Sequence, residues 1–215
     1  MKRFISLLTT VMLILVPFMC YAEKHIPEFD QPFSIRNGIG YQHDKSAVQR
    51  AEKNAKLEDD GTVFVDYVEL GEFFNVWLTY HFDSANKLSS FHYYIRSDAY
   101  SSLKNQLKSK YGTPIYHNEI SPIKTSAWEE VLYNWNSDNY SVYPQTVTFD
   151  VNACDCWFIK FADCYVVVEL LGIKAGKYQF TSLGYMPISN TKMESILREL
   201  KVNDENIQNS YKNDL

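Results

Sequence analysis

The middle of the chain shows the clearest alternation of apolar and polar residues. Apolar side chains recur at every second position from 74 to 82, which is the period of a β-strand with one buried face. The turn-forming run from Asp83 to Asn86 follows, and a four-residue loop there would join this strand to a second one. The cross-strand pairs expected from that loop are Phe74 with Ile95, Val76 with Tyr93 and Leu78 with Phe91. The pattern therefore predicts a β-hairpin with one continuous apolar face, to which Tyr80 and Phe82 also belong.

Two stretches have helical spacing with starting and stopping signals. Asp44 can cap a helix over residues 45–57, and Asp98 can cap a second helix that runs to about Lys110 and stops at Gly112. The positions expected to face inward are Val48, Ala51, Ala55, Ala99, Leu103 and Leu107. The acidic run 58–61 lacks the alternating oxygen ligands of a calcium loop, so we interpret it as a solvated helix end.

Runs of β-branched and aromatic residues predict further strands, separated by Asn, Asp and Gly turns. They cover residues 62–67, 142–151, 156–161, 165–171 and 178–185. Residues 115–131 have a mixed pattern and receive no assignment. Thr191 and Glu194 form a capping box that opens a C-terminal helix. Its apolar stripe consists of Met193, Ile196, Leu197 and Leu200.

These elements predict a single α+β domain over residues 44–205. Its sheet is mostly antiparallel, its helices pack on one face, and it ends in the amphipathic C-terminal helix. Residues 23–43 form an extended N-terminal segment, and the tail 206–215 is expected to fray. No repeat or low-complexity linker in the sequence indicates a second domain.

The N-terminus has the three parts of an export signal. Lys2 and Arg3 are positively charged, residues 4–18 are apolar, and Cys20 and Ala22 put small residues at the positions that a signal peptidase reads. Cleavage is expected after Ala22. Two alternatives stay open: residues 4–22 could span a membrane as an anchor, and Cys20 could carry lipid, although Met19 stands where lipoproteins have a small residue. The mature chain is expected in the periplasm or the medium.

Composition narrows the possible partners. Apolar residues make up 46% of the chain and aromatic residues 15%, enough apolar surface to offset the entropy of folding. Removing Lys2 and Arg3 leaves 19 of the 21 basic residues against 26 acidic ones, a formal charge of −7. This acidic balance argues against nucleic acid as a partner. The longest apolar run after Ala22, residues 165–173, contains Glu169 and is too short for a membrane span.

One segment resembles a known kind of exported protein. The run Tyr80-His81-Phe82-Asp83 leads to Lys87-Leu88, and a helix then closes on Leu107-x-x-Lys110-Tyr111-Gly112-Thr113-Pro114. This pattern, within residues 44–114, resembles β-lactamase-inhibitor-protein-like modules and small outer-membrane-assembly lipoproteins of bacteria. The resemblance implies an extracytoplasmic α/β module that binds other proteins and has no catalytic residues.

Three cysteines remain after cleavage, so at least one thiol is unpaired within a chain. Cys154 and Cys156 share one strand face about 6.6 Å apart, which makes Cys164 the shared partner of any disulfide. With a tight turn at residues 162–163, Phe161 would lie opposite Cys164. With a five-residue loop, Cys156 would lie opposite Cys164 instead. Buried free thiols are the alternative interpretation, and a redox-active cysteine is a further hypothesis. A zinc site would need a second ligand pair that the sequence does not show.

The remaining polar residues give no catalytic or metal-binding motif. The predicted register places His92 opposite Trp77 and about 13 Å from His81, too far to share an ion. The acidic residues Glu129, Glu130, Asp155 and Asp163 could serve a secreted hydrolase only if two of them met in a cleft. The sequence contains no nucleophile elbow, metalloprotease, phosphate-loop or dinucleotide motif, so neither a catalytic residue, a cofactor nor a metal site is predicted.

The run from 133 to 144 interleaves aromatic residues with Asn, Ser and Asp. Tyrosine and tryptophan give a large contact area at a low entropy cost, and small polar groups add hydrogen bonds. The candidate binding residues are Tyr133, Trp135, Tyr140 and Tyr143, although the same aromatics could pack in a core. The sequence thus favours an exported, non-catalytic module that binds another extracytoplasmic protein, with a secreted hydrolase as the alternative.

Overall fold

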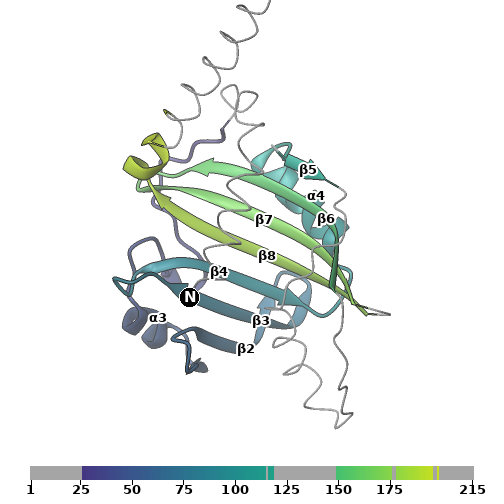
Figure 1. Ribbon diagram of the computed structural model, residues 1–215, viewed down its shortest axis with the longest axis horizontal. Coiled ribbons are helices and arrows are strands. Elements are labelled where there is room, and N and C mark those ends of the chain that lie inside the picture. Colours follow the sequence, from purple (N-terminus) through teal and green to yellow (C-terminus); the bar gives the residue numbers. More distant parts are fainter. Residues whose placement is uncertain (1–25, 115, 119–148, 176–177, 196–197, 199–215) are drawn as a thin grey trace, which may run out of the picture.

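The computed structural model describes residues 26–114, 116–118, 149–175, 178–195 and 198. They form an α+β fold around an eight-stranded, antiparallel sheet with the strand order β1-β2-β3-β4-β8-β7-β6-β5 (Figure 1). The predicted fold class, α+β with antiparallel strands, is confirmed at this level.

Before β5, the described part of the chain contains one short 3-10 helix and two α-helices. They are η2 (Arg36–Gly38), α3 (Lys45–Ala51) and α4 (Tyr100–Tyr111). The first four strands are β1 (Ala55–Leu57), β2 (Val63–Leu70), β3 (Phe73–Phe82) and β4 (Leu88–Ile95). The other four are β5 (Tyr116–Asn118), β6 (Phe149–Lys160), β7 (Cys164–Ala175) and β8 (Tyr178–Ser189).

Among the described elements, the order of helices and strands repeats once. A helix, a short edge strand and three longer antiparallel strands occur as α3-β1-β2-β3-β4 and again as α4-β5-β6-β7-β8. The two halves meet where β4 pairs with β8, so the three-residue strands β1 and β5 form the two edges of the sheet. Short edge strands limit pairing with other chains. This repeat lies in the order of elements and not in similar residues, so it leaves no signal in the sequence.

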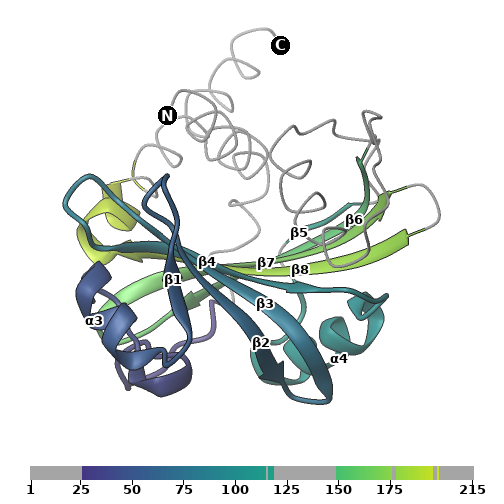
Figure 2. The ribbon, with the colours of Figure 1, turned by 90° about the horizontal axis from the view of Figure 1, so that it is seen from below.

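Both α3 and α4 lie on the same side of the sheet, the helix-covered face (Figure 2). Val48 of α3 and Leu103 and Leu107 of α4 join the main hydrophobic core there, as their spacing predicted. The core continues across both halves of the sheet through Leu78, Phe91, Trp157, Val168 and Leu183. One apolar layer therefore supports both halves.

The predicted hairpin forms, but its register differs by two residues. Leu78 lies opposite Tyr93 instead of Phe91, and Phe82 lies opposite Leu88. The turn is longer than expected because Asp83 Oδ1 accepts hydrogen bonds from the backbone of Ala85 and Lys87, each at 2.9 Å. A bulge next to Phe82 adds one more residue on β4. An even shift keeps the same side chains on the buried face.

Phe74 is exposed, contrary to the alternation that predicted it as buried. Asn75 next to it has a φ of 56°, in the left-handed region, and this breaks the alternation of side chains along β3. Phe73 packs against the core in its place.

The first helix is much shorter than predicted. Asp44 caps it as expected, because its Oδ1 accepts a hydrogen bond from Ala47 N–H at 2.8 Å, but the helix ends at Ala51. Residues 55–57 instead form β1 and pair with β2. The acidic run 58–61 is the turn between these strands, with Gly61 at a φ of 85°, and not a helix end.

The second helix begins without the predicted cap. Ala99, and not Asp98, is the N-cap residue, and its N–H donates to Thr181 Oγ1 at 3.0 Å. Gly112 ends the helix at a φ of 84°, as predicted.

Differences at the other strands are mostly in length. Two predicted strands, 142–151 and 156–161, are joined: residues 149–151 of the former and residues 156–160 of the latter belong to one continuous strand, β6. A helix begins at residues 190–195, where Ser189 Oγ accepts from Lys192 N–H at 3.2 Å in place of the predicted Thr191 cap. Met193 packs on Phe158 and Val167, on the face of the sheet opposite α3 and α4.

Several predictions fall outside the described residues. These are the export signal 1–22, most of the segment 115–148, the stripe beyond Met193 and the tail 206–215. In the described ranges no helix is both long enough and apolar enough to cross a membrane.

Candidate functional site

Polar side chains gather on the face of the sheet that α3 and α4 do not cover, here called the opposite face. The strand register aligns His92, Gly184, Glu169 and Cys156 in one row across β4, β8, β7 and β6. Cys154 lies two residues from Cys156 on the same face. Any two of the four row residues are between 13 and 92 positions apart in the chain, so only the sheet topology brings them together.

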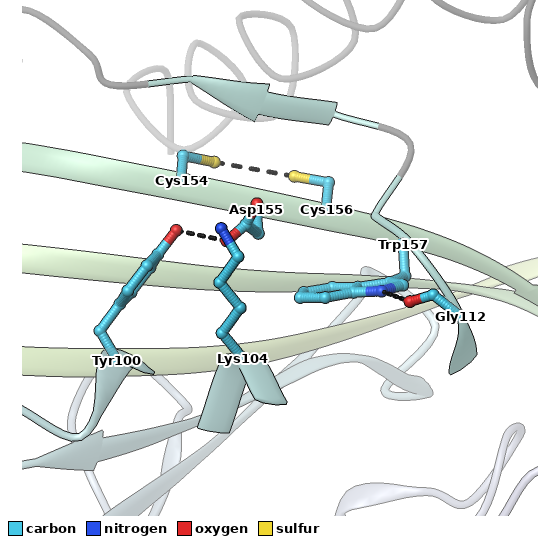
Figure 3. A network of polar contacts seen from close by, with 7 residues as sticks. All are labelled: Tyr100, Lys104, Gly112, Cys154, Asp155, Cys156 and Trp157. Atoms are coloured by element: carbon cyan, nitrogen blue, oxygen red, sulfur yellow. Dashed lines mark hydrogen bonds and ion pairs between the residues drawn. The ribbon is translucent and has the colours of Figure 1, made fainter. Parts of the chain in front are cut away.

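The two thiols of Cys154 and Cys156 point away from α4, while Asp155 and Trp157 between and beside them point toward it (Figure 3). Both cysteines are buried, and their Sγ atoms are 3.7 Å apart. The pKa of the Cys156 thiol is well above its usual value. The hydrogen bond with the Cys154 thiol is the largest cause, and burial is the second. Without a bound cation this thiol is protonated at neutral pH.

The structure does not bring Cys156 and Cys164 together. The turn at residues 162–163 is tight, with Phe161 N–H donating to Cys164 O at 2.8 Å, so Cys164 pairs with Ser189 and Cys156 with Glu169. Cys164 is also part of the core on the helix-covered face. All three thiols are free and buried, as in the alternative interpretation, and the candidate disulfide does not fit this register.

Glu169 places a carboxyl group beside the two thiols. Its side chain lies in a long apolar strand and only 9% of the residue is exposed. Burial raises the pKa of this carboxyl to about 7, and no hydrogen bond or ion pair to another described residue holds it. The oxygen and the two sulfurs lie within 4.8 Å of one another. In the sequence Glu169 interrupts an apolar run, and a lone acidic residue in a buried strand is the signal that could indicate this site.

The two central histidines are neighbours, contrary to the prediction. His92 lies opposite Thr79, not Trp77, so the rings of His81 and His92 are 5.6 Å apart between centroids. The two-residue change in register explains the difference. A Cβ atom at Gly184 would stand 2.7 Å from His92 Nδ1, so the imidazole fills the space above that glycine. Burial, and secondly the charge of His81, lower the pKa of His92 to about 3.

The acidic residues considered for hydrolysis do not form a shared cleft in the described residues. Asp155 is completely buried. It accepts a hydrogen bond from Tyr100 Oη at 2.5 Å and forms an ion pair with Lys104 Nζ at 2.9 Å (Figure 3). Asp163 lies beyond the end of β6, more than about 16 Å along the strand, and accepts from Phe33 N–H at 2.8 Å. Glu129 and Glu130 lie outside the described residues.

A second buried carboxylate has the same kind of partners in the first half. Glu52 accepts a hydrogen bond from Tyr80 Oη at 2.5 Å and pairs with Arg36 Nε at 3.0 Å. Each half thus has a buried acid that contacts one tyrosine and one cation, and Glu52 also accepts a hydrogen bond from Asn37 Nδ2 at 3.1 Å. We call these groups the carboxylate clamps.

Three large apolar side chains of the described residues are exposed on the first three strands. Leu57, Tyr67 and Phe74 are 54%, 66% and 66% exposed, and they lie on β1, β2 and β3. Tyr67 has a φ of 55°, in the left-handed region that bulky residues rarely adopt.

The candidate binding residues Tyr133, Trp135, Tyr140 and Tyr143 lie outside the described residues, so they stay a prediction. The chain matches no protein-family model, no curated protein and no solved structure.

Replacing Asp155 with Ala is expected to lower the free energy of unfolding by about 3–5 kcal/mol, because the Lys104 cation and the Tyr100 hydroxyl lose their buried partner. Lys56→Ala removes an ion pair to Asp66 whose lysine is 63% exposed, and less than about 1 kcal/mol is expected. Denaturant unfolding of both variants measures the difference. Equal losses would contradict the assignment of Asp155 as a clamp.

His92 is expected to make the fold sensitive to acid. Its folded-state pKa is about 3 and the usual value is 6.5, so protons bind the unfolded chain first as the pH falls. The stability that neutral His92 contributes is complete above pH 6.5 and is lost toward pH 3, by roughly 1.4 kcal/mol for each unit of pKa depression. Unfolding curves of the wild type and His92→Gln over this range measure the effect. Parallel pH profiles would show that His92 is not the group responsible.

Proposed function

We propose that this chain is an exported, non-catalytic module that binds another protein outside the cytoplasm. The observation that carries the proposal is Tyr67, a bulky residue that is both exposed and held in a left-handed backbone conformation. Such a conformation costs an ordinary residue on the order of 1–2 kcal/mol, and Asn or Gly would occupy it at a lower cost. A contact with a partner is a reason to keep tyrosine there.

The surroundings of Tyr67 suit a protein contact. Phe74 on the neighbouring strand is equally exposed, whereas exposed Leu57 on β1 lies opposite Val63, four residues before Tyr67. Aromatic side chains on a rigid sheet contribute large contact areas with little loss of entropy. Tyr67 with Phe74, and the aromatic run 133–144, are the two candidate contact regions.

The resemblance to β-lactamase-inhibitor-like modules is part of the same proposal. It agrees with a protein-binding role and adds no site residue. The amphipathic continuation of the C-terminal helix beyond Met193 belongs to the same proposal, whereas its first turn packs on the face opposite α3 and α4 and so corrects the prediction that all helices share one face.

The double variant Tyr67→Asn with Phe74→Thr tests the role of the exposed aromatics. Loss of a binding hot spot lowers affinity tenfold or more. Tyr67→Asn alone is expected to raise the free energy of unfolding by about 1 kcal/mol, because Asn tolerates the left-handed region. The measurement is quantitative recovery of bound proteins from the envelope and medium of the native organism, with wild type and variant as bait.

The matched control is Asn105→Ala with Lys108→Ala, two exposed positions on α4 far from β2 in the chain. It is expected to recover the same partner as the wild type. A third bait, Trp135→Ala with Tyr140→Ala, tests the other contact region. If every bait recovers each protein equally, neither region is a binding site and the proposal fails.

Export predicts a mature chain that begins at Glu23. Intact mass and N-terminal sequencing of the protein from its own host are expected to show the loss of residues 1–22 and its presence outside the cytoplasm. An uncleaved chain in the cytosol would contradict export.

A further inference from the structure

The cluster of Cys154, Cys156 and Glu169 is a group of potential metal ligands that the proposed binding role does not use. Within the described residues, these are the three Cys, His, Asp or Glu side chains whose ligand atoms all come within 4.8 Å of one another. They come from neighbouring strands, β6 and β7, and Cys156 is directly opposite Glu169. We propose that these side chains bind Zn²⁺ through two thiolate sulfurs and one carboxylate oxygen.

The distance between the sulfurs fits this ion. Two sulfurs at about 2.3 Å from a tetrahedral zinc lie about 3.8 Å apart. The Sγ atoms of Cys154 and Cys156 are 3.7 Å apart, so the ion could enter between them with little change in the backbone. In a zinc site the carboxylate oxygen would stand about 3.6 Å from each sulfur. The Glu169 oxygen already lies within 4.8 Å of both sulfurs, so a small movement of its side chain is enough.

A second observation points to a ligand at the same place. Glu169 is 91% buried, and no hydrogen bond or ion pair joins its carboxyl group to another described residue. Buried carboxyl groups normally have such partners, because removing them from water is costly. A cation bound by Glu169 would satisfy this carboxylate.

The donor set selects among metals. Thiolates disfavour Ca²⁺ and Mg²⁺, which take oxygen ligands. Two thiolates alone would suit Cu⁺, whereas the added carboxylate favours Zn²⁺, which accepts both sulfur and oxygen. Three protein ligands leave the fourth tetrahedral position to water or another group.

The test uses the full mature chain, reduced and stripped of metal. Equilibrium dialysis against Zn²⁺ is expected to give one ion per chain, and Co²⁺ is expected to give the absorption of thiolate-bound, tetrahedral cobalt. Cys154→Ser and Cys156→Ser should each weaken Zn²⁺ binding by more than about 100-fold, because losing an outer-shell partner already costs 10–100-fold. Glu169→Gln should weaken binding while leaving the cobalt–thiolate absorption in place.

Cys164→Ser is the matched control, since this cysteine is equally buried but lies on the helix-covered face. It should bind Zn²⁺ like the wild type, and circular dichroism of each variant verifies folding. A folded wild type that takes up no Zn²⁺ would overturn the proposal. So would equal loss in Cys164→Ser, or unchanged affinity in Glu169→Gln. Because no protein partner is present in this experiment, its outcome is independent of the proposed binding function.

Discussion

The attachment of the helices to the sheet depends on two buried carboxylates. Among its described residues, α3 buries only Val48, and α4 buries Leu103, Leu107 and Tyr111. These are small apolar contacts for layers that must stay in one orientation. Asp155 ties two residues of α4 to β6, and Glu52, just after α3, ties η2 to β3. A buried ion pair adds little net stability compared with apolar packing, but breaking it is costly. We infer that the clamps fix the orientation of the helices on the sheet, and that they add less to the stability of the attachment.

Local patterns predicted the elements, and long-range pairing decided the details. The caps at Asp44 and Gly112 and the inward faces of both helices follow from neighbouring residues, and they agree with the structure. Three other features escaped prediction: the register of the hairpin, the early end of α3 and the exposure of Phe74. They depend on a side-chain acceptor in a turn, on Glu52 reaching Tyr80, and on one left-handed residue. None of these leaves a periodic signal.

The candidate sites show the same division. Period-two spacing placed Cys154 and Cys156 on one face, and counting cysteines indicated at least one free thiol. Nothing near Cys156 in the sequence points to Glu169, because their contact is created by the pairing of β6 with β7. Likewise, His81 and His92 meet only because the hairpin register is two residues away from the simplest one. Chemistry shared between strands becomes visible only when the pairing is known.

The close fit of His92 over Gly184 has an evolutionary consequence for the joint between the two halves. Nothing larger than hydrogen fits at position 184 while an imidazole occupies the space above it. A related chain that keeps the histidine must keep the glycine, and one with a smaller residue at 92 could accept a side chain at 184. Substitutions at these two positions, 92 places apart in the chain, are therefore expected to covary across any set of relatives.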